Sequence, residues 1–310
     1  MTAASTPRRP ATLPSLLLIV AVLCWAGNFV LGRAVHGDIP PLTLTFWRWL
    51  VATLVLLPFA LGPLWASRSV LVGHWRLIAT LAATGVVLFH VLVYAALRST
   101  PATNASLIMA TLPVVVPIVS LLLDGIRIGR AEALGIALSL LGVAVIVVRG
   151  DPAALFSFRP APGDALMLLA VPIWALYTVL LRRLPPGLPP LATLLAIAAL
   201  GVAMLAPAYL WELATTGGIA ASGTNVLAIL YVGVFASVIS YICWNRGVIA
   251  VGATRAGQFI HLMPVFATLL ALVLLGEALR PFHAVGIALI AAGIVSAQGM
   301  ARPGRVKERC

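Results

Sequence analysis

The chain has 310 residues, of which 62% are apolar and only 9% are charged, and its formal net charge is +12. So few charged residues cannot cover the surface of a water-soluble protein of this length, and apolar runs of about 20 residues, long enough to span a bilayer, recur throughout. The sequence therefore predicts an integral membrane protein. Its basic residues lie in loops and tails, where they orient membrane proteins, so no nucleic-acid partner is expected.

In chain order, the apolar runs predict ten transmembrane helices and no other regular structure. They are expected near residues 14–34, 41–62, 75–98, 101–124, 131–148, 164–183, 188–211, 224–248, 252–275 and 281–300. Around them the expected organisation is a cytoplasmic N-terminal tail, a first five-helix repeat, a periplasmic linker, a second five-helix repeat and a basic cytoplasmic tail. The corresponding ranges are 1–13, 14–148, 149–163, 164–300 and 301–310.

Four prolines lie inside these expected spans. Proline has no backbone N–H and leaves the carbonyl four residues earlier without its helical partner. Such breaks are tolerated in a membrane where neighbouring groups or a watery cavity satisfy the backbone. We therefore expect interruptions or kinks at Pro113, Pro117, Pro172 and Pro264.

The two halves of the chain repeat one another. Six small residues and prolines recur 151 residues later: Ala102, Ala105, Pro113, Gly125, Gly135 and Gly142 match Ala253, Ala256, Pro264, Gly276, Gly286 and Gly293. At an offset of 149, Trp25 matches Trp174, and Asn28 matches Tyr177. A unit with an odd number of spans faces the opposite way in its second copy. We therefore predict an inverted repeat around a central cavity, which is typical of secondary transporters.

The basic residues indicate the orientation. With the N-terminus in the cytoplasm, fourteen Lys and Arg residues fall on the inner side and five on the outer side, and Arg48 lies within a span. Positively charged loops stay in the cytoplasm. We therefore predict that both termini are cytoplasmic.

Four sets of residues carry a family resemblance: Cys24–Phe29, Phe46–Trp49, Ala102–Pro113 with its copy Ala253–Pro264, and Gly135–Gly142 with its copy Gly286–Gly293. Over roughly residues 14–298, the chain resembles the EamA family of the drug/metabolite transporter superfamily. The resemblance implies export of small metabolites, often amino acids, across the bacterial inner membrane by alternating access. Aromatic amino-acid exporters are the favoured subgroup. One departure is that Glu277 follows Gly276, whereas Asp124 precedes Gly125, which weakens any functional role for this acid.

Polar and aromatic residues within the spans are the candidate substrate contacts, because a polar group in lipid needs a partner or a function. We expect a cavity between the first, third, fourth, sixth, eighth and ninth helices. The candidates are Trp25, Asn28, Arg48, His90, Tyr94, Asn104, Trp174, Tyr177, Tyr241, Asn245, Gln258 and His261. Pairs three or four residues apart, such as His90 and Tyr94, share one helix face.

Some of these residues have a simpler alternative. Trp47, Trp49, Trp65 and Trp75 are expected in the interfacial aromatic belt. Arg48 lies about 10 Å into its helix, so it either snorkels to the headgroups or contacts the substrate. His90 and His261 either line the path or pair with backbone groups in the core.

The absence of acidic residues deep in any expected span excludes some transport chemistries. Cationic drugs and a carboxylate proton relay both need such an acid, whereas Arg48 and helix N-termini favour a substrate carboxylate. The three cysteines have no metal or disulfide spacing, so no metal or cofactor is expected.

The sequence favours a carrier over an enzyme or a sensor. It has neither a Gly-x-Ser-x-Gly nor a His-Glu-x-x-His motif, and its tails are too short for an output domain. We predict an exporter of neutral amino acids, with aromatic ones favoured. The alternative is a carrier for another small organic anion, a sugar or a nucleoside-type metabolite. The oligomeric state is open.

Overall fold

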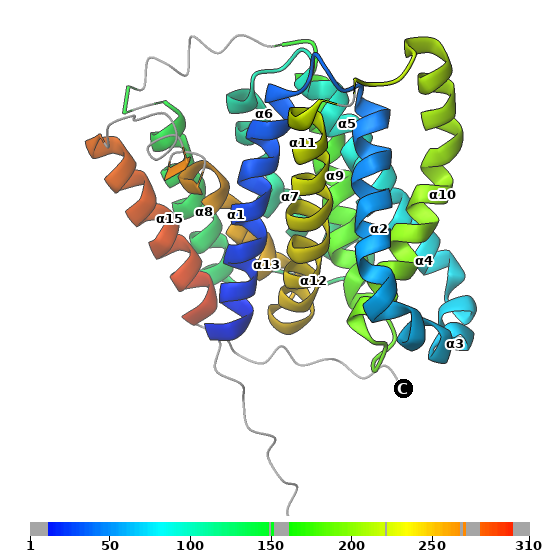
Figure 1. Ribbon diagram of the computed structural model, residues 1–310. Coiled ribbons are helices and arrows are strands. Elements are labelled where there is room, and N and C mark those ends of the chain that lie inside the picture. The colour runs from blue at the N-terminus through cyan, green and yellow to red at the C-terminus, as the bar shows by residue number, and fades with distance from the viewer. Residues whose placement is uncertain are drawn as a thin grey trace, which may run out of the picture.

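The computed structural model describes residues 12–148, 150–151, 161–220, 222–266, 269–270 and 280–299. Within these residues all regular elements are helices, which stand side by side in one bundle (Figure 1). In the first half they are α1 (Thr12–Ala34), α2 (Pro41–Ala66), α3 (Arg68–Gly73), α4 (Trp75–Ala82), η1 (Ala83–Leu88), α5 (Phe89–Leu97), α6 (Ala102–Met109), α7 (Leu112–Asp124) and α8 (Arg130–Val147). In the second half they are α9 (Asp164–Leu180), η3 (Leu181–Arg183), α10 (Pro190–Thr216), α11 (Gly223–Gly233), η4 (Val234–Ile239), α12 (Ser240–Val251), α13 (Ala253–Gln258), η5 (Phe259–Leu262) and α15 (Pro281–Gly299).

Eight helices in the described part of the chain are long and apolar enough to cross a membrane. They coincide with the first eight expected spans, although the fourth qualifies only from Leu107 to Asp124. The tenth expected span corresponds to α15, whose apolar part, Pro281–Ala297, is shorter. The ninth lies partly outside the described residues, as do Glu277, most of the linker and nearly all of both tails.

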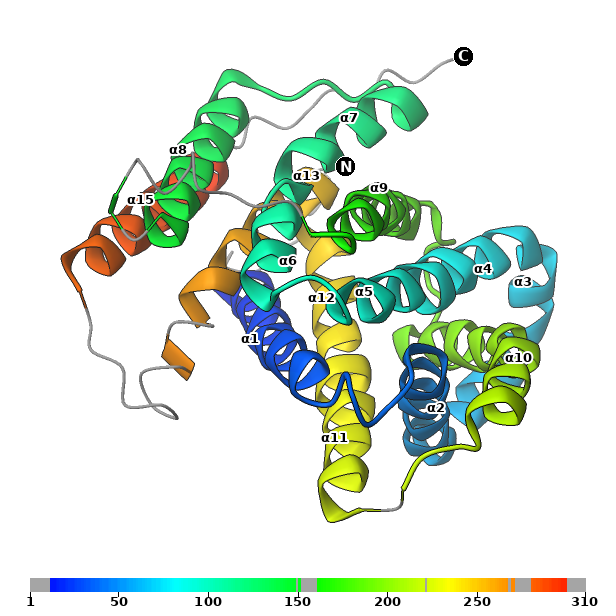
Figure 2. The ribbon, with the colours of Figure 1, turned by 90° about the horizontal axis from the view of Figure 1, so that it is seen from above.

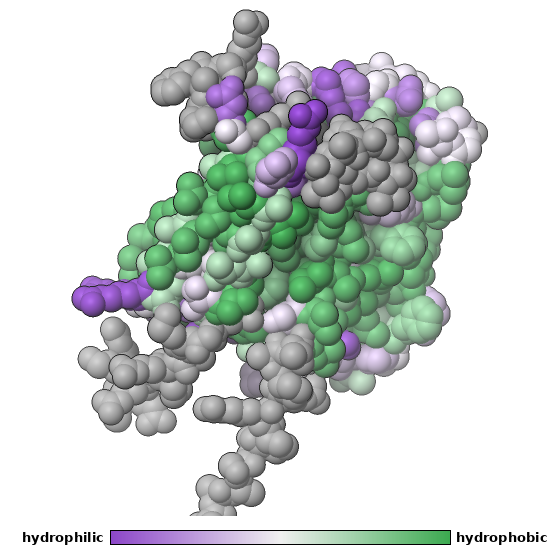
Figure 3. Space-filling model, turned by 90° about the vertical axis from the view of Figure 1, so that its left-hand side faces the viewer, coloured by the Kyte–Doolittle hydropathy of each residue, from purple (hydrophilic) through white to green (hydrophobic). Residues whose placement is uncertain are grey.

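The outer surface matches the predicted lipid environment. Figure 3 shows a broad band of apolar residues on one face, with polar residues gathered toward its two edges. Large apolar side chains such as Phe59, Leu122 and Val295 are 67%, 78% and 68% exposed. Trp65 and Trp75 are also well exposed, as expected for an aromatic belt.

Two of the four prolines coincide with breaks. α6 ends at Met109 and α7 begins at Leu112, with Pro113 in its first turn. The matching segment of the second half, Phe259–Leu262, tightens into a 3₁₀ turn just before Pro264. Pro117 and Pro172 remain inside continuous helices, so an interruption was wrong for these two and the kink is the alternative that is left. A single missing hydrogen bond kinks a helix without ending it when packing holds both sides.

Equivalent helices of the two halves pack against each other in antiparallel fashion. A β-carbon on Gly135 would lie 2.5 Å from the Gly293 carbonyl oxygen, and one on Gly142 would lie 2.6 Å from that of Gly286. The numbering therefore rises along α8 as it falls along α15. α2 and α10 are also antiparallel, because Phe46 stacks on Tyr209 at 4.1 Å between ring centroids and Thr43 contacts Glu212. Viewed from above, the two pairs flank the central helices (Figure 2).

The third and eighth spans each contain one π-helical turn. These turns, Ala83–Leu88 and Val234–Ile239, are separated by the 151-residue offset of the repeat. A π-helical turn widens the helix and leaves carbonyl groups free for other donors, and such turns are frequent at functional sites. The repeat has therefore kept a local irregularity at the same depth in both halves.

Candidate functional site

A cavity with about 370 Å³ of empty space, open solvent included, lies between helices of the two halves. Apolar and aromatic side chains form most of its wall, and three polar residues from the first half, Asn28, Arg48 and His90, interrupt it. The full lining comprises Trp25, Asn28, Phe29, Arg48, Phe89, His90, Val93, Met109, Trp174, Ile260 and Met263. An apolar pocket with a few polar groups is typical of small-molecule binding.

Arg48 is the most unusual group in this wall. Its side chain is fully buried. It therefore does not snorkel to the headgroups. Nε donates to Ser237 Oγ at 2.6 Å and Nη2 to the Ala236 carbonyl at 2.6 Å. Nη1 donates to Tyr94 Oη at 2.9 Å and, at 3.3 Å, to Asn28 Oδ1.

All of these partners are neutral. The ion pairs among the described residues join Arg183 to Asp124 and Arg255 to Glu132, all near helix ends. Burying an ion without a counter-ion is costly, and neutral acceptors offset only part of that cost. The cavity therefore carries an uncompensated positive charge at its wall.

One asparagine–tyrosine hydrogen bond occurs in each half, with the two residue types exchanged. In the first half Tyr94 Oη donates to Asn28 Oδ1 at 2.7 Å. In the second half Tyr177 Oη donates to Asn245 Oδ1 at 3.0 Å. Because Asn28 matches Tyr177 and Tyr94 matches Asn245 in the repeat, the same contact is made twice from swapped side chains.

Aromatic rings fill the centre between the halves. Trp25 lies 5.1 Å from Trp174 and 5.1 Å from Trp244, measured between ring centroids. Trp174 lies 5.0 Å from Tyr177. Trp49 is fully buried and meets Tyr241 edge to face at 4.8 Å. Its expected place in the interfacial belt was wrong, because its face of α2 turns toward this cluster rather than toward lipid.

The two π-helical turns each offer a carbonyl to this cluster. Tyr241 Oη donates to the Gly85 carbonyl. At the matching position, the Ala236 carbonyl accepts from Trp25 Nε1 at 3.0 Å as well as from Arg48. Each half therefore satisfies the irregular backbone of the other half, as buried polar backbone requires.

His90 is buried with its Nδ1 3.1 Å from the Val86 carbonyl. Because a carbonyl can only accept, Nδ1 carries the proton, and Nε2 of the neutral ring is an acceptor. No other described residue hydrogen-bonds to this ring. His90 therefore presents one acceptor at the cavity wall.

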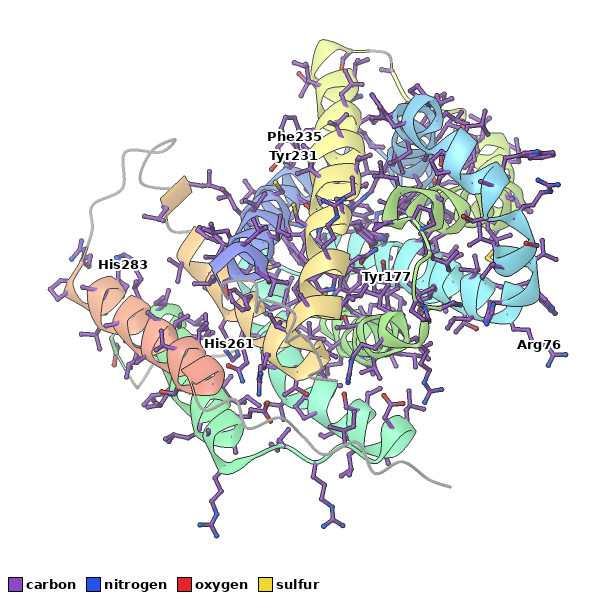
Figure 4. The ribbon with its side chains drawn as sticks, turned by 90° about the horizontal axis from the view of Figure 1, so that it is seen from below. Arg76, Tyr177, Tyr231, Phe235, His261 and His283 are labelled. Atoms are coloured by element: carbon purple, nitrogen blue, oxygen red, sulfur yellow. The ribbon has the colours of Figure 1, made fainter. Side chains whose placement is uncertain are left out.

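The structure places the predicted site residues in three groups. Trp25, Asn28, Arg48, His90 and Trp174 line the cavity. Tyr94, Tyr177, Tyr241 and Asn245 lie one contact behind it, in the aromatic and hydrogen-bond network; Figure 4 shows Tyr177 inside the bundle. Asn104, Gln258 and His261 are not among the lining residues.

These last three residues have other surroundings. His261 Nδ1 lies 2.6 Å from Ser139 Oγ, and Nε2 lies 2.9 Å from the Ala110 carbonyl, toward the side of α8 and α15 (Figure 4). His261 thus pairs with groups in the core, which was one of the two alternatives for this histidine. Asn104 Nδ2 donates to Asp164 Oδ2 at 3.3 Å. Gln258 is buried, and neither amide atom has a hydrogen-bond partner among the described residues. Their contact with substrate remains a prediction.

Sequence reasoning missed Ser237 and the apolar wall residues Phe29, Phe89, Met109 and Met263. Ser237 had one signal, a hydroxyl within an apolar span. The wall residues had none, because apolar residues in a membrane helix look alike whether they face lipid or a cavity.

Comparison with known proteins gives a family. The profile of the EamA-like transporter family matches residues 12–148 and 161–297. An uncharacterized transporter of Archaeoglobus fulgidus is 31% identical over 286 residues, which are 90% of this chain and 95% of the relative. A solved crystal structure superposes with a TM-score of 0.73 at 24% identity, covering 95% of this chain and 100% of the other, so the two share a fold.

Two other relatives have names that state a substrate class. The aromatic amino acid exporter YddG of Ancylobacter novellus is 25% identical, over 93% of this chain and 98% of the exporter. A probable terminal-alkyne amino-acid exporter of Streptantibioticus cattleyicolor is 28% identical, over 90% of this chain and 91% of the relative.

Proposed function

Because the chain belongs to the EamA-like transporter family, we propose that it exports neutral amino acids, preferentially aromatic ones, across the bacterial inner membrane by alternating access. The observation that carries the proposal is the cavity between the two halves, with aromatic walls and a few polar groups. Trp25 and Trp174 offer faces and edges to an aromatic side chain. Asn28 and His90 offer hydrogen bonds to its polar end.

The proposed architecture is ten transmembrane helices arranged as a 5+5 inverted repeat, with both termini in the cytoplasm. The antiparallel packing of α8 on α15 and of α2 on α10 supports it, since equivalent helices run in opposite directions only if the two repeats face opposite ways. The two family matches, 12–148 and 161–297, fit the same division.

The substrate class rests on what surrounds the cavity. None of its lining residues is acidic, which disfavours organic cations. The names of two relatives, an aromatic amino acid exporter and a probable terminal-alkyne amino-acid exporter, favour amino acids. The buried Arg48 also keeps the alternative of another organic anion open, because a carboxylate without an ammonium group fits the same charge.

Two polar contacts between the halves suit alternating access. Arg255 Nε contacts Glu132 Oε1 at 3.1 Å, and Asn104 Nδ2 contacts Asp164 Oδ2 at 3.3 Å. Asn104 and Arg255 are equivalent residues of the repeat, and their helices, α6 and α13, lie toward opposite ends of the bundle (Figure 1). We propose that each contact closes one mouth and opens in turn.

The substrate test is counterflow in proteoliposomes loaded with a panel of unlabelled amino acids, with labelled phenylalanine outside. Wild-type vesicles should accumulate label, and Trp174→Ala should abolish the accumulation. Trp65→Ala is the matched control, because Trp65 is 65% exposed on the lipid side and should leave counterflow unchanged. Folded wild-type protein that gives no signal with the whole panel would refute amino-acid export and favour the organic-anion alternative.

Alternating access is tested by cross-linking the two mouths separately. Glu132→Cys with Arg255→Cys, and Asn104→Cys with Asp164→Cys, are made in a background in which Cys24, Cys243 and Cys310 are replaced by serine. A short bis-methanethiosulfonate cross-linker, which forms a disulfide with each cysteine, should block counterflow at either mouth, and a reductant should cleave the disulfides and restore it. If neither cross-link slows transport, the proposed mechanism is wrong.

A further inference from the structure

We infer that Arg48 binds a carboxylate on the transported substrate. Only the first half of the repeat supplies this charge, so the site holds one anionic group. The inference deepens the proposed function and rests on it for the direction of transport. Four observations carry it: the burial of Arg48, its neutral partners, its position at the cavity wall, and its replacement by an apolar residue in the second half.

The guanidinium makes three short hydrogen bonds and one long one. Nε and Nη2 donate to Ser237 and to the Ala236 carbonyl, both at 2.6 Å, on the π-helical turn η4. On the other edge, Nη1 donates to Tyr94 Oη at 2.9 Å and reaches Asn28 Oδ1 only at 3.3 Å. Asn28 lines the cavity with Arg48, whereas Ser237 and Ala236 do not.

The long contact is the one that a substrate can replace. Asn28 Oδ1 also accepts a shorter hydrogen bond from Tyr94 Oη, at 2.7 Å. It therefore keeps a hydrogen-bond donor when Nη1 donates to another acceptor. A carboxylate oxygen is a stronger acceptor than an amide oxygen, because an ionised acceptor roughly doubles the strength of a hydrogen bond. It also supplies the counter-charge that the neutral partners of Arg48 do not.

Comparison of the two repeats shows whether Arg48 is needed for the structure of the neighbouring asparagine–tyrosine pair. The residue equivalent to Arg48 is Ile197, which is fully buried in α10. The asparagine–tyrosine hydrogen bond nevertheless forms in both halves. The guanidinium is therefore not required to hold that pair together, and its charge has no equivalent in the second half. One buried cation predicts one carboxylate for each transported molecule.

Binding is measured first on the wild-type protein with a matched pair of probes, 3-phenylpropanoate and 3-phenylpropanamide, which differ in the carboxylate alone. Each probe is labelled, and its binding to the purified protein is measured directly by equilibrium dialysis. The carboxylate should bind at least about 30-fold more tightly than the amide, the factor expected at the low end for a buried charge pair. Equal affinities would overturn the inference without any variant.

Two substitutions then locate the effect. Arg48→Met keeps the length of the side chain but removes its charge, and should abolish the preference for the carboxylate probe. Arg48→Lys keeps the charge without the planar fork and should restore part of it. The control, Arg33→Met, removes a cation whose Nη1 contacts the Leu97 carbonyl instead, and should keep the full preference. A folded Arg48→Met protein that retains the preference would refute the assignment.

The probes also separate this inference from the proposed function. If 3-phenylpropanoate binds in an Arg48-dependent way but no amino acid shows counterflow, amino-acid export fails and the carboxylate site stands. If amino acids show counterflow with the same KM in wild type and Arg48→Met, export stands and the carboxylate site fails.

Discussion

Trp25 and Trp174, which occupy the same position in the two repeats, touch each other edge to face with ring centroids 5.1 Å apart and planes at 90°. The contact between equivalent residues places the junction of the two halves at the cavity wall. The indole N–H groups differ, however. Trp25 Nε1 donates to the Ala236 carbonyl at 3.0 Å. Trp174 Nε1 is buried without a partner in the described part of the chain, because Tyr241 donates to the carbonyl of Gly85, the residue equivalent to Ala236.

This difference predicts that the same substitution mainly affects stability at one position and mainly affects KM at the other. Trp25→Phe loses a buried hydrogen bond and should lower the stability of the protein by about 1 kcal/mol. Trp174→Phe loses none and should change stability less, yet it removes a free donor at the cavity and should raise KM more. Thermal unfolding in detergent and counterflow kinetics measure the two effects. Equal changes in both variants would contradict the distinction.

Close packing of α8 on α15 predicts that Gly142→Ala is destabilising. The added methyl group would lie 2.6 Å from the Gly286 carbonyl oxygen, so the helices must separate, at a cost of about 1–3 kcal/mol for such overpacking. Thermal unfolding in detergent measures the loss.

Gly62→Ala in α2 is the matched control, because a β-carbon there meets nothing within 4 Å. Gly62 precedes Pro63, whose ring restricts a preceding residue that has a β-carbon and so opposes the better helix propensity of alanine. This variant should therefore change stability far less than Gly142→Ala. If both alanine variants behave alike, the close approach of α8 and α15 is wrong.

The two buried histidines should differ in the property they affect. His261→Leu removes the hydrogen bonds to Ser139 Oγ and to the Ala110 carbonyl and should lower the unfolding temperature while KM stays near the wild-type value. His90→Leu removes an acceptor from the cavity wall and should raise KM with a smaller change in unfolding temperature. The reverse pattern would assign the substrate contact to His261 instead.

Glu212 should stabilise the start of α2 from the neighbouring α10. Its carboxylate accepts from the Thr43 backbone N–H at 2.6 Å, from Thr43 Oγ1 at 2.8 Å and from the Leu42 N–H at 3.3 Å. Glu212→Ala removes these acceptors and should cost about 0.5–2 kcal/mol, the usual range for a lost helix cap. Glu212→Gln keeps one acceptor oxygen and should cost less. Unfolding by heat, with both variants in the same detergent, gives the comparison.

The sequence by itself determined the class of protein and the positions of its helices. Runs of apolar residues can only be spanning helices in lipid, so eight expected spans were found where they were predicted. The internal repeat predicted equivalent positions such as Trp25 and Trp174, and prolines with a matched copy, Pro113 and Pro264, lie at breaks. These features depend on the local chain alone.

Only the tertiary structure decided which side of each helix faces the cavity. Lipid is as apolar as a protein core, so hydropathy does not separate a lipid-facing residue from a buried one. For this reason Trp49 was expected at the interface and lies in the aromatic cluster, and Phe89 and Met109 were not foreseen in the wall. Arg48 had two possible directions from one position in α2. Its burial follows from acceptors at Ala236 and Ser237, nearly 190 residues away, that folding alone brings to it.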